Sequence, residues 1–487
     1  MKIQVKPNTV FFVFLSVYAL LGFINLTQLP VAWTDEVLNI DPAIQFHLNG
    51  NFTSKLWPNP GSDKVFASYL PLAHWTHTLT LYLFDFNIFN IRLPYLLMHC
   101  FTIWLLFNYL QQNIRNGNKW IPLLLTLVFA LDKSVFEISR SVRIEVPTML
   151  LISIYLSLQN KLNLQFLRIS ILGLLSMAHL FIWPLVFFWF LQELLRSHSI
   201  TTKTISFGLV LAPTILFLYQ LDFNFKTLIE QLGMQTHDHR IVSTDLQHHP
   251  LINSFWYRFF PHYREQPIMW LVYMTLFFLL PYLTIRYKLF RRIDNIQLIG
   301  FITLTIVLFF IGSPQYRYLP PWLLLAFMLS SKIPQINWHY KYLMPILVII
   351  VFISFLSFGG RHLAACIQRP QRDATAMLNF IHKNIPQNQH KTLIWGESIG
   401  SYYCNGYVLK SKAKAQNQVF DYALDIYPQH WKNQNYDQVF LITHEDQPQL
   451  KLVAKYEVKP YFKLPNWAKS FAKGGTYDGT KIYRLAP

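Results

Sequence analysis

Long uncharged apolar runs recur from residue 8 to about residue 360 and constrain the fold more than any other feature of this chain. The first run, Asn8 to Thr34, carries no charged side chain and exceeds the roughly 20 residues that a helix needs to cross a hydrocarbon core. Only 14% of the residues are charged, against about 25% in soluble domains. The chain is therefore predicted to be a polytopic α-helical membrane protein.

Basic residues between the runs predict how the chain crosses the membrane. Lys2 and Lys6 precede the first run, so the positive-inside rule predicts a cytoplasmic N-terminus in the inner cell membrane. Alternation of the later runs gives about eleven spans and leaves residues 361–487 outside the cytoplasm. The later runs are Leu93–Ile114, Trp120–Phe136, Val146–Leu158, Thr204–Leu221, Met269–Ile285, Gln297–Gly312, Leu319–Ser330 and Tyr342–Phe358.

The stretch Ile169 to Gln192 fits either one helix or two short helices hinged near His179 and Pro184. Two helices leave the basic residues that follow, such as Arg196 and Lys203, on the cytoplasmic side, whereas one helix puts them outside. We therefore predict two helices in this stretch.

Residues 33–92 and 222–267 form two long loops on the predicted external side. The first loop holds two amphipathic segments, Asp35–Asn49 and Leu72–Phe86. Neither segment is apolar all round, so each is expected to lie on the membrane surface rather than to span it. We expect these juxtamembrane helices to belong to the membrane domain, residues 1–360.

The composition changes to that of a soluble domain from residue 361 onward. Periodicity predicts a helix at Ala374–Asn384 and strands at Lys391–Trp395, Gln438–Thr443 and Lys481–Leu485. Residues 361–487 are therefore predicted to form a small α/β extracytoplasmic domain, which is long enough to bury a core of its own.

The formal charge of +18 would suggest nucleic acid as a partner of a soluble protein. In a membrane protein, basic cytoplasmic loops attracted to anionic headgroups account for this positive charge, so no nucleic-acid partner is expected.

The three cysteines show no metal-ligand spacing, and a pairing of Cys366 with Cys404 stays open. No cofactor is required by these patterns; Mg²⁺ or Mn²⁺ at an acidic site stays an alternative without a dedicated ligand set.

Charged residues gather on the predicted external side of the membrane. They are Asp35, Glu36, Lys64, Arg140, Arg143, Glu145, Glu230, Arg240 and Arg317. Charges beside hydrocarbon are costly, so they pair, face a cavity or act in chemistry. A carboxylate removes a proton from an attacking hydroxyl, and the planar fork of arginine binds two phosphate oxygens. The set is therefore what a transfer from a lipid phosphate would need.

A structural interpretation exists for each of these groups. Asp35 and Glu36 also suit the first turn of an interfacial helix, where the helix dipole favours anions. Arg140, Arg143 and Glu145 also suit a salt-bridged turn. Arg317, beside Tyr318, also suits an interfacial anchor.

Four motifs, in this order and spacing, resemble a known family. They are Trp33-Thr34-Asp35-Glu36, Pro71-Leu-Ala-His-Trp75 through Arg92-Leu-Pro94, Ser139-Arg140-Ser-Val-Arg143-Ile-Glu145, and Tyr316-Arg317-Tyr318-Leu-Pro320. Together they resemble the GT-C glycosyltransferases that use polyprenyl-phosphate sugars, a group that includes protein O-mannosyltransferases and the lipid A aminoarabinose transferase. The resemblance covers roughly residues 10 to 360.

The resemblance implies roles for particular residues. Asp35 would be the catalytic base and Glu145 the second acid, and Glu36 is the further predicted catalytic residue. The lipid phosphate would be held by Arg317 first and Arg143 next. The further predicted substrate-binding residues are Arg140, Tyr318 and His74, which lie in these motifs, and His179 in the predicted hinge.

The chain departs from the family pattern at two places. Aminoarabinose-type relatives carry a lysine just before the proline that opens the second motif, whereas Tyr69 and Leu70 precede Pro71 here. Lys64 is the alternative phosphate ligand. His179 stands where some relatives have lysine or threonine.

The resemblance implies transfer of a sugar, with inversion, from a polyprenyl-phosphate donor to a lipid, glycan or protein acceptor. Two other classes stay open: an O-antigen ligase or polymerase, with its essential residues in a late loop, and a flippase or transporter. A transporter would carry ionisable residues near the membrane midplane, whereas the charges here gather at one face.

Overall fold

The structure is a computed structural model. It describes residues 6–28, 34–54, 65–67, 69–84, 88–114, 118–197, 199–232, 267–287, 296–308, 319–331, 342–367, 369–385, 392–396, 420–424, 437–459, 463 and 476–485. For Asp35, only the backbone is described.

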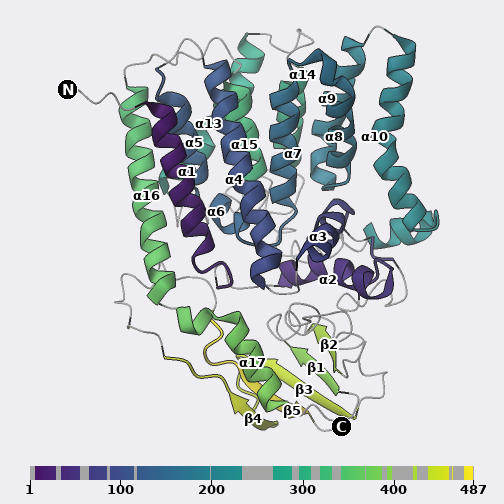
Figure 1. Cartoon of the computed structure of the whole chain (residues 1–487), viewed down its shortest axis with the longest axis vertical. Coiled ribbons are helices and arrows are strands. Elements are labelled where there is room, and N and C mark those ends of the chain that lie inside the picture. The colour runs from purple at the N-terminus through teal and green to yellow at the C-terminus, as the bar shows by residue number, and fades with distance from the viewer. Residues whose placement is uncertain are drawn as a thin grey trace, which may run out of the picture.

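Helices stand side by side as a bundle up to residue 367, and α2 and α3 lie across one end of it (Figure 1). In chain order the helices are α1 (Pro7–Phe23), α2 (Thr34–Asn49), α3 (Leu72–Leu83), α4 (Ile88–Asn113), α5 (Ile121–Ala130), α6 (Lys133–Ser139), α7 (Glu145–Leu158), α8 (Gln165–Ser176), α9 (Trp183–Arg196), α10 (Ile200–Gln220), α13 (Pro267–Arg286), α14 (Ile296–Ile306), α15 (Leu319–Ser330) and α16 (Leu343–Ile367). The bundle encloses a buried apolar core to which almost all of them contribute.

Several of the described helices are long and apolar enough to cross a membrane. They lie at Ile88–Asn113, Ile200–Gln220, Met269–Arg286 and Leu343–Ala364. Helices satisfy all their backbone polar groups internally, as the bilayer core requires. The prediction of a mostly helical, multi-pass membrane protein is therefore confirmed.

Two predicted runs end or break where a polar residue changes the backbone. The first run was expected to continue to Thr34, but α1 ends at Phe23, and Asn25 follows with a left-handed φ of 61°. Asparagine tolerates this conformation, which terminates helices. The run Trp120–Phe136 is divided into α5 and α6 because the carboxylate of Asp132 accepts a hydrogen bond from the backbone N–H of Val135 at 3.1 Å and caps the second helix.

The stretch from Gln165 to Arg196 forms two helices, as predicted. A short 3₁₀ turn at Leu180–Ile182 separates α8 from α9, and Pro184 lies in the first turn of α9, where its missing N–H is not needed. The side chain of His179 accepts a hydrogen bond from the N–H of Phe181 at 3.3 Å, which shapes the hinge.

The two amphipathic segments predicted between residues 33 and 92 are helical, as expected. α2 covers the predicted segment Asp35–Asn49, and α3 begins at the predicted residue, Leu72. The two helices pack against each other.

Helix α16 continues to Ile367 and so extends past residue 360, the predicted last residue of the membrane domain.

A five-stranded mixed sheet lies beyond the end of the bundle that carries α2 and α3 (Figure 1). Its strand order is β2 (Phe420–Leu424), β1 (Thr392–Gly396), β3 (Gln438–Thr443), β5 (Lys481–Leu485) and β4 (Lys451–Lys455). β1 runs parallel to β2 and β3, and β5 runs antiparallel to β3 and β4. Helix α17 (Ala374–Asn384) packs beside the sheet through Phe380, whose ring lies 5.0 Å from that of Tyr456.

Candidate functional site

Glu36 lies on α2 and joins three segments of the membrane domain. Its two carboxylate oxygens accept hydrogen bonds from Arg92 Nε at 2.9 Å and Nη2 at 2.7 Å. Oε1 also accepts from the backbone N–H of Val142 at 3.0 Å, and Arg92 Nη1 donates to the carbonyl of Leu26 at 2.8 Å. Both charged side chains are fully buried. The pair therefore holds α2 against α4 and against the turn before α7.

That turn carries the next two predicted residues. Arg143 donates from Nε and Nη2 to the two carboxylate oxygens of Glu145, at 3.0 and 2.7 Å, and both side chains are buried. Arg140 donates from Nη2 to the carbonyl of Ile24 at 2.7 Å and lies over the ring of Phe136 at 5.1 Å. The salt bridge expected from the structural interpretation of this turn is thus present between Arg143 and Glu145.

His74 lies on the face of α3 that packs on α2. Its Nδ1 donates to the backbone carbonyl of Asn39 at 3.1 Å, and the side chain is 2% exposed. Burial lowers the pKa of His74 to about 4, partly offset by that hydrogen bond. His74 is therefore neutral at physiological pH.

His77, one turn further along α3, meets α4. Its Nδ1 contacts the hydroxyl of Tyr95, and both side chains are fully buried. Burial and the neighbouring His74 lower the pKa of His77 well below its usual value. Because Arg92 and Tyr95 lie three residues apart on α4, one face of that helix holds both α2 and α3.

The hinge that contains His179 lies against the start of α3. The N–H of Leu72 donates to the carbonyl of Met177 at 3.0 Å, and the indole of Trp75 donates to Gln220 at 3.3 Å. Apolar residues from these segments and from the turn before Glu145 form one buried cluster. The structure thus brings the segments of Glu36, His74, Glu145 and His179 together at one end of the bundle.

The remaining predicted residues are described in part or not at all. Asp35 occupies the first turn of α2, next to Glu36, with its backbone alone described. Lys64, Arg317 and Tyr318 lie outside the described residues. Within the described part of the chain, no group of three or more His, Cys, Asp or Glu side chains is placed to hold a metal ion.

Arg92 was not singled out as a site residue from the sequence, although an arginine at the start of an apolar helix signals a buried partner.

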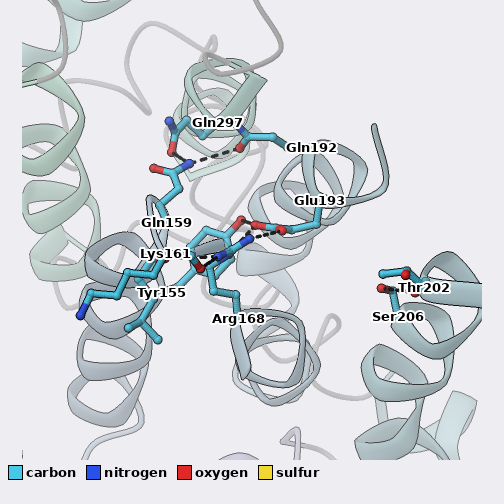
Figure 2. Close-up of polar contacts among 10 residues, drawn as sticks. Tyr155, Gln159, Lys161, Arg168, Gln192, Glu193, Thr202, Ser206 and Gln297 are labelled. Atoms are coloured by element: carbon cyan, nitrogen blue, oxygen red, sulfur yellow. Dashed lines mark hydrogen bonds and ion pairs between the residues drawn. The ribbon is translucent and has the colours of Figure 1, made fainter. Parts of the chain in front are cut away.

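A second charged pair, at the opposite end of α7 from Glu145, was also missed. Arg168 donates to both oxygens of Glu193 at 2.9 and 2.7 Å, and Tyr155 donates to Glu193 at 3.2 Å. Figure 2 shows these side chains pointing toward one another between α7, α8 and α9.

Gln159 extends this second cluster to α14. Its side-chain amide donates to Gln297 at 2.8 Å and to Gln192 at 3.4 Å (Figure 2). Arg168 also donates to the carbonyls of Leu158 and Lys161, beyond the end of α7. The cluster therefore closes the far ends of four helices and takes no part in the candidate site.

No family model matches this chain, and no curated protein matches it in sequence. Among solved structures, ArnT from Cupriavidus metallidurans in the apo state is similar with a TM-score of 0.55 at 10% identity, over 98% of each chain. ArnT bound to undecaprenyl phosphate is similar with a TM-score of 0.53 at 9% identity, over 97% of each chain.

The S. cerevisiae protein O-mannosyltransferase Pmt1-Pmt2 complex bound to the sugar donor gives a TM-score of 0.30 at 18% identity, over 47% of this chain and 35% of that chain. That score is too low to support a shared fold. The likeness to ArnT extends over nearly the whole of both chains, and at such low identity it establishes the fold. This chain has the fold of ArnT, the kind of fold that the resemblance of its motifs predicted.

Proposed function

We propose that this chain is a glycosyltransferase of the inner cell membrane that moves a hexose or pentose from a polyprenyl-phosphate donor to an acceptor on the external face. The acceptor is a lipid, a glycan or a protein. The N-terminus is cytoplasmic in this proposal, and the C-terminal domain, residues 361–487, is extracytoplasmic.

The ArnT fold over 98% of the chain is the observation that carries the proposal. ArnT has been solved with undecaprenyl phosphate bound, which is the lipid part of the proposed donor. The juxtamembrane helix α2 supports the same function, because it carries Asp35 at the end of the bundle that faces the C-terminal sheet (Figure 1). A lipid-borne donor and a water-borne acceptor can meet at that depth.

Asp35 is the general base in this proposal. It takes the proton of the acceptor hydroxyl while that oxygen forms a bond to the anomeric carbon of the donor. The bond from the anomeric carbon to the phosphate oxygen breaks, and the polyprenyl phosphate leaves with the electron pair. Attack opposite the leaving group inverts the anomeric configuration.

Basic side chains stabilise the charge that grows on the departing phosphate. Arg317 is the proposed first ligand and Arg143 the second, with Lys64 as the alternative. Glu36 acts as a positioning residue, since both of its oxygens are already bound by Arg92 and the backbone of Val142. Glu145 similarly orients Arg143 through two hydrogen bonds.

The test is sugar transfer by the purified protein from a panel of radiolabelled undecaprenyl-phosphate sugars into a membrane extract. Asp35→Asn should lower transfer by about 10²–10⁴-fold, the usual contribution of a positioned base. Asp222→Asn is the matched control, because it makes the same change at an exposed acid after α10. It should transfer like the wild type.

Two results would contradict the proposal. Near-normal transfer by Asp35→Asn would remove Asp35 from the role of base. Absence of transfer from every donor, by a wild-type protein that still binds undecaprenyl phosphate, would favour a ligase or a flippase. The donor that supports transfer identifies the sugar.

A further inference from the structure

Three polar atoms on one face of α3 are buried without a hydrogen-bond partner among the described residues. They are Nε2 of His74, Nε2 of His77 and Oγ1 of Thr78. The three side chains are at most 8% exposed. Their spacing, i, i+3 and i+4, places them on the same side of the helix. Each buried polar atom left unsatisfied costs about 1–3 kcal/mol, so three together indicate a ligand.

The hydrogen bond between His74 and Asn39 determines whether Nε2 of His74 is a donor or an acceptor. Nδ1 meets the backbone carbonyl of Asn39 at 3.1 Å, and a carbonyl oxygen only accepts. Nδ1 therefore carries the hydrogen. In a neutral imidazole the other nitrogen is then a bare acceptor. His74 presents an acceptor.

The contact of His77 fixes the opposite role. Its Nδ1 contacts the hydroxyl of Tyr95. Among the described residues, His77 is the hydrogen-bond partner of that hydroxyl. The buried phenol hydrogen needs an acceptor, so it is donated to Nδ1, and the hydrogen of the neutral imidazole is on Nε2. His77 presents a donor.

Thr78 adds a hydroxyl that both donates and accepts. Its neighbours on α3 use their hydroxyls within the helix: Thr76 donates to the carbonyl of Leu72 at 2.7 Å, and Thr80 donates to the carbonyl of Thr76 at 3.0 Å. Thr78 makes no such bond. Its hydroxyl is therefore left for a partner outside α3.

We propose that this face of α3 binds hydroxyl groups of the sugar carried by the lipid donor. A hydroxyl donates and accepts at once, so one sugar hydroxyl can donate to His74 and accept from His77, while a second one pairs with Thr78. A phosphate, which has only acceptor oxygens when ionised, would leave the acceptor nitrogen of His74 unmatched. The subsite rests on the proposed glycosyltransferase function and assigns the sugar-binding role within it.

The position of this subsite agrees with the proposed chemistry. The backbone carbonyl that orients His74 belongs to Asn39 of α2, four residues after Asp35 and three after Glu36. The same α4 face that binds Glu36 through Arg92 binds His77 through Tyr95. The subsite and the proposed base thus lie on two helices, α3 and α2, that pack against each other.

The experiment compares binding of two ligands, undecaprenyl phosphate with and without its sugar, to the purified full-length protein. His74→Asn keeps a donor for the carbonyl of Asn39 and removes Nε2, and His77→Asn keeps an acceptor for Tyr95 and removes Nε2. Thr78→Val removes only the hydroxyl. Thr80→Val is the matched control on the same helix, since its hydroxyl is bonded within α3.

Each of the three site variants should bind the sugar-bearing lipid about 10-fold more weakly, the effect of one lost hydrogen bond, and the bare lipid as the wild type does. The control should bind both lipids normally. Wild-type affinity of all three variants for the sugar-bearing lipid would overturn the subsite while leaving the transferase proposal intact. Equal weakening for both lipids would show a structural role instead. A wild type that neither distinguishes the two lipids nor transfers any sugar would refute both proposals.

Discussion

Glu36 and Arg92 show how single residues organise this membrane domain. The pair is fully buried and makes two hydrogen bonds, at 2.9 and 2.7 Å. A buried ion pair adds little net stability compared with apolar residues, but removing one partner leaves an uncompensated charge. The pair therefore acts as a positional constraint on α2, and with it on Asp35.

We expect Glu36→Gln to destabilise the protein by about 3–5 kcal/mol, because Arg92 keeps its buried charge without a carboxylate. Unfolding by denaturant in detergent measures this. Glu230→Gln is the control: it breaks an exposed contact of 4.0 Å with Lys226 and should cost less than about 1 kcal/mol. Equal stability of Glu36→Gln and the wild type would show that the pair does not hold α2.

His74 and His77 predict a dependence of stability on pH. Burial lowers the pKa of His74 to about 4 and that of His77 well below its usual value, whereas both take up protons near pH 6.5 in the unfolded chain. The two neutral imidazoles therefore make their full contribution to the free energy of unfolding above about pH 6.5. That contribution is lost as the pH falls toward 4, because the unfolded chain binds the protons more tightly. Thermal unfolding from pH 7.5 to 4.5 should show this decline, and His74→Asn should reduce its slope. An unchanged slope would contradict the assignment.

At the scale of elements, close approach of helices places the hinge of His179. Gly173 on α8 faces the backbone of α10, and a Cβ added there would lie 2.8 Å from the carbonyl oxygen of Leu209 and 3.1 Å from that of Val210. Small residues permit such approach between membrane helices. The absence of a side chain at Gly173 thus lets α8 and α10 pack, and both helices end beside α3.

Gly173→Ala should destabilise the protein by about 1–3 kcal/mol, because backbone atoms cannot move aside as a side chain can. Gly208→Ala on α10 is the matched control, since a Cβ there meets nothing within 4 Å. It should be neutral or gain up to about 1 kcal/mol from helix propensity. Thermal unfolding in detergent compares the two, and equal effects would argue against the close contact.

At the scale of the whole molecule, the described N-terminal end of α1 and the C-terminal sheet lie at opposite ends of the bundle (Figure 1). The candidate site lies at the end that faces the sheet. With a cytoplasmic N-terminus, the site and the sheet are both external. Under the proposed function, the donor lipid would then reach the site from the external leaflet.

This topology predicts opposite reporter activities at the two ends of the chain. Alkaline phosphatase needs disulfides and so is active only outside the cytoplasm. Fused after residue 487 it should be active, and fused after Arg196, at the end of α9, it should be inactive. Activity of both fusions, or of the second alone, would contradict the orientation.

Elements that depend on local patterns could be predicted from the sequence. Apolar runs of sufficient length predicted the membrane helices, and periodicity placed α2, α3, α17, β3 and β5 within three residues of their observed ends. β2 (Phe420–Leu424) and β4 (Lys451–Lys455) were not predicted, because a strand is stabilised by neighbours that are distant in sequence. The motif order predicted the fold, and it named most of the segments that meet at the candidate site.

Which polar groups meet depends on how the helices pack, and could not be predicted from the sequence. Glu36 and Arg92 are 56 residues apart, and Arg168 and Glu193 are 25 apart, so no local rule pairs them. Tertiary structure likewise turned His77 toward Tyr95 on another helix. A charge or an imidazole takes its partner and its protonation from what burial places next to it. That placement is set by the packing of whole helices.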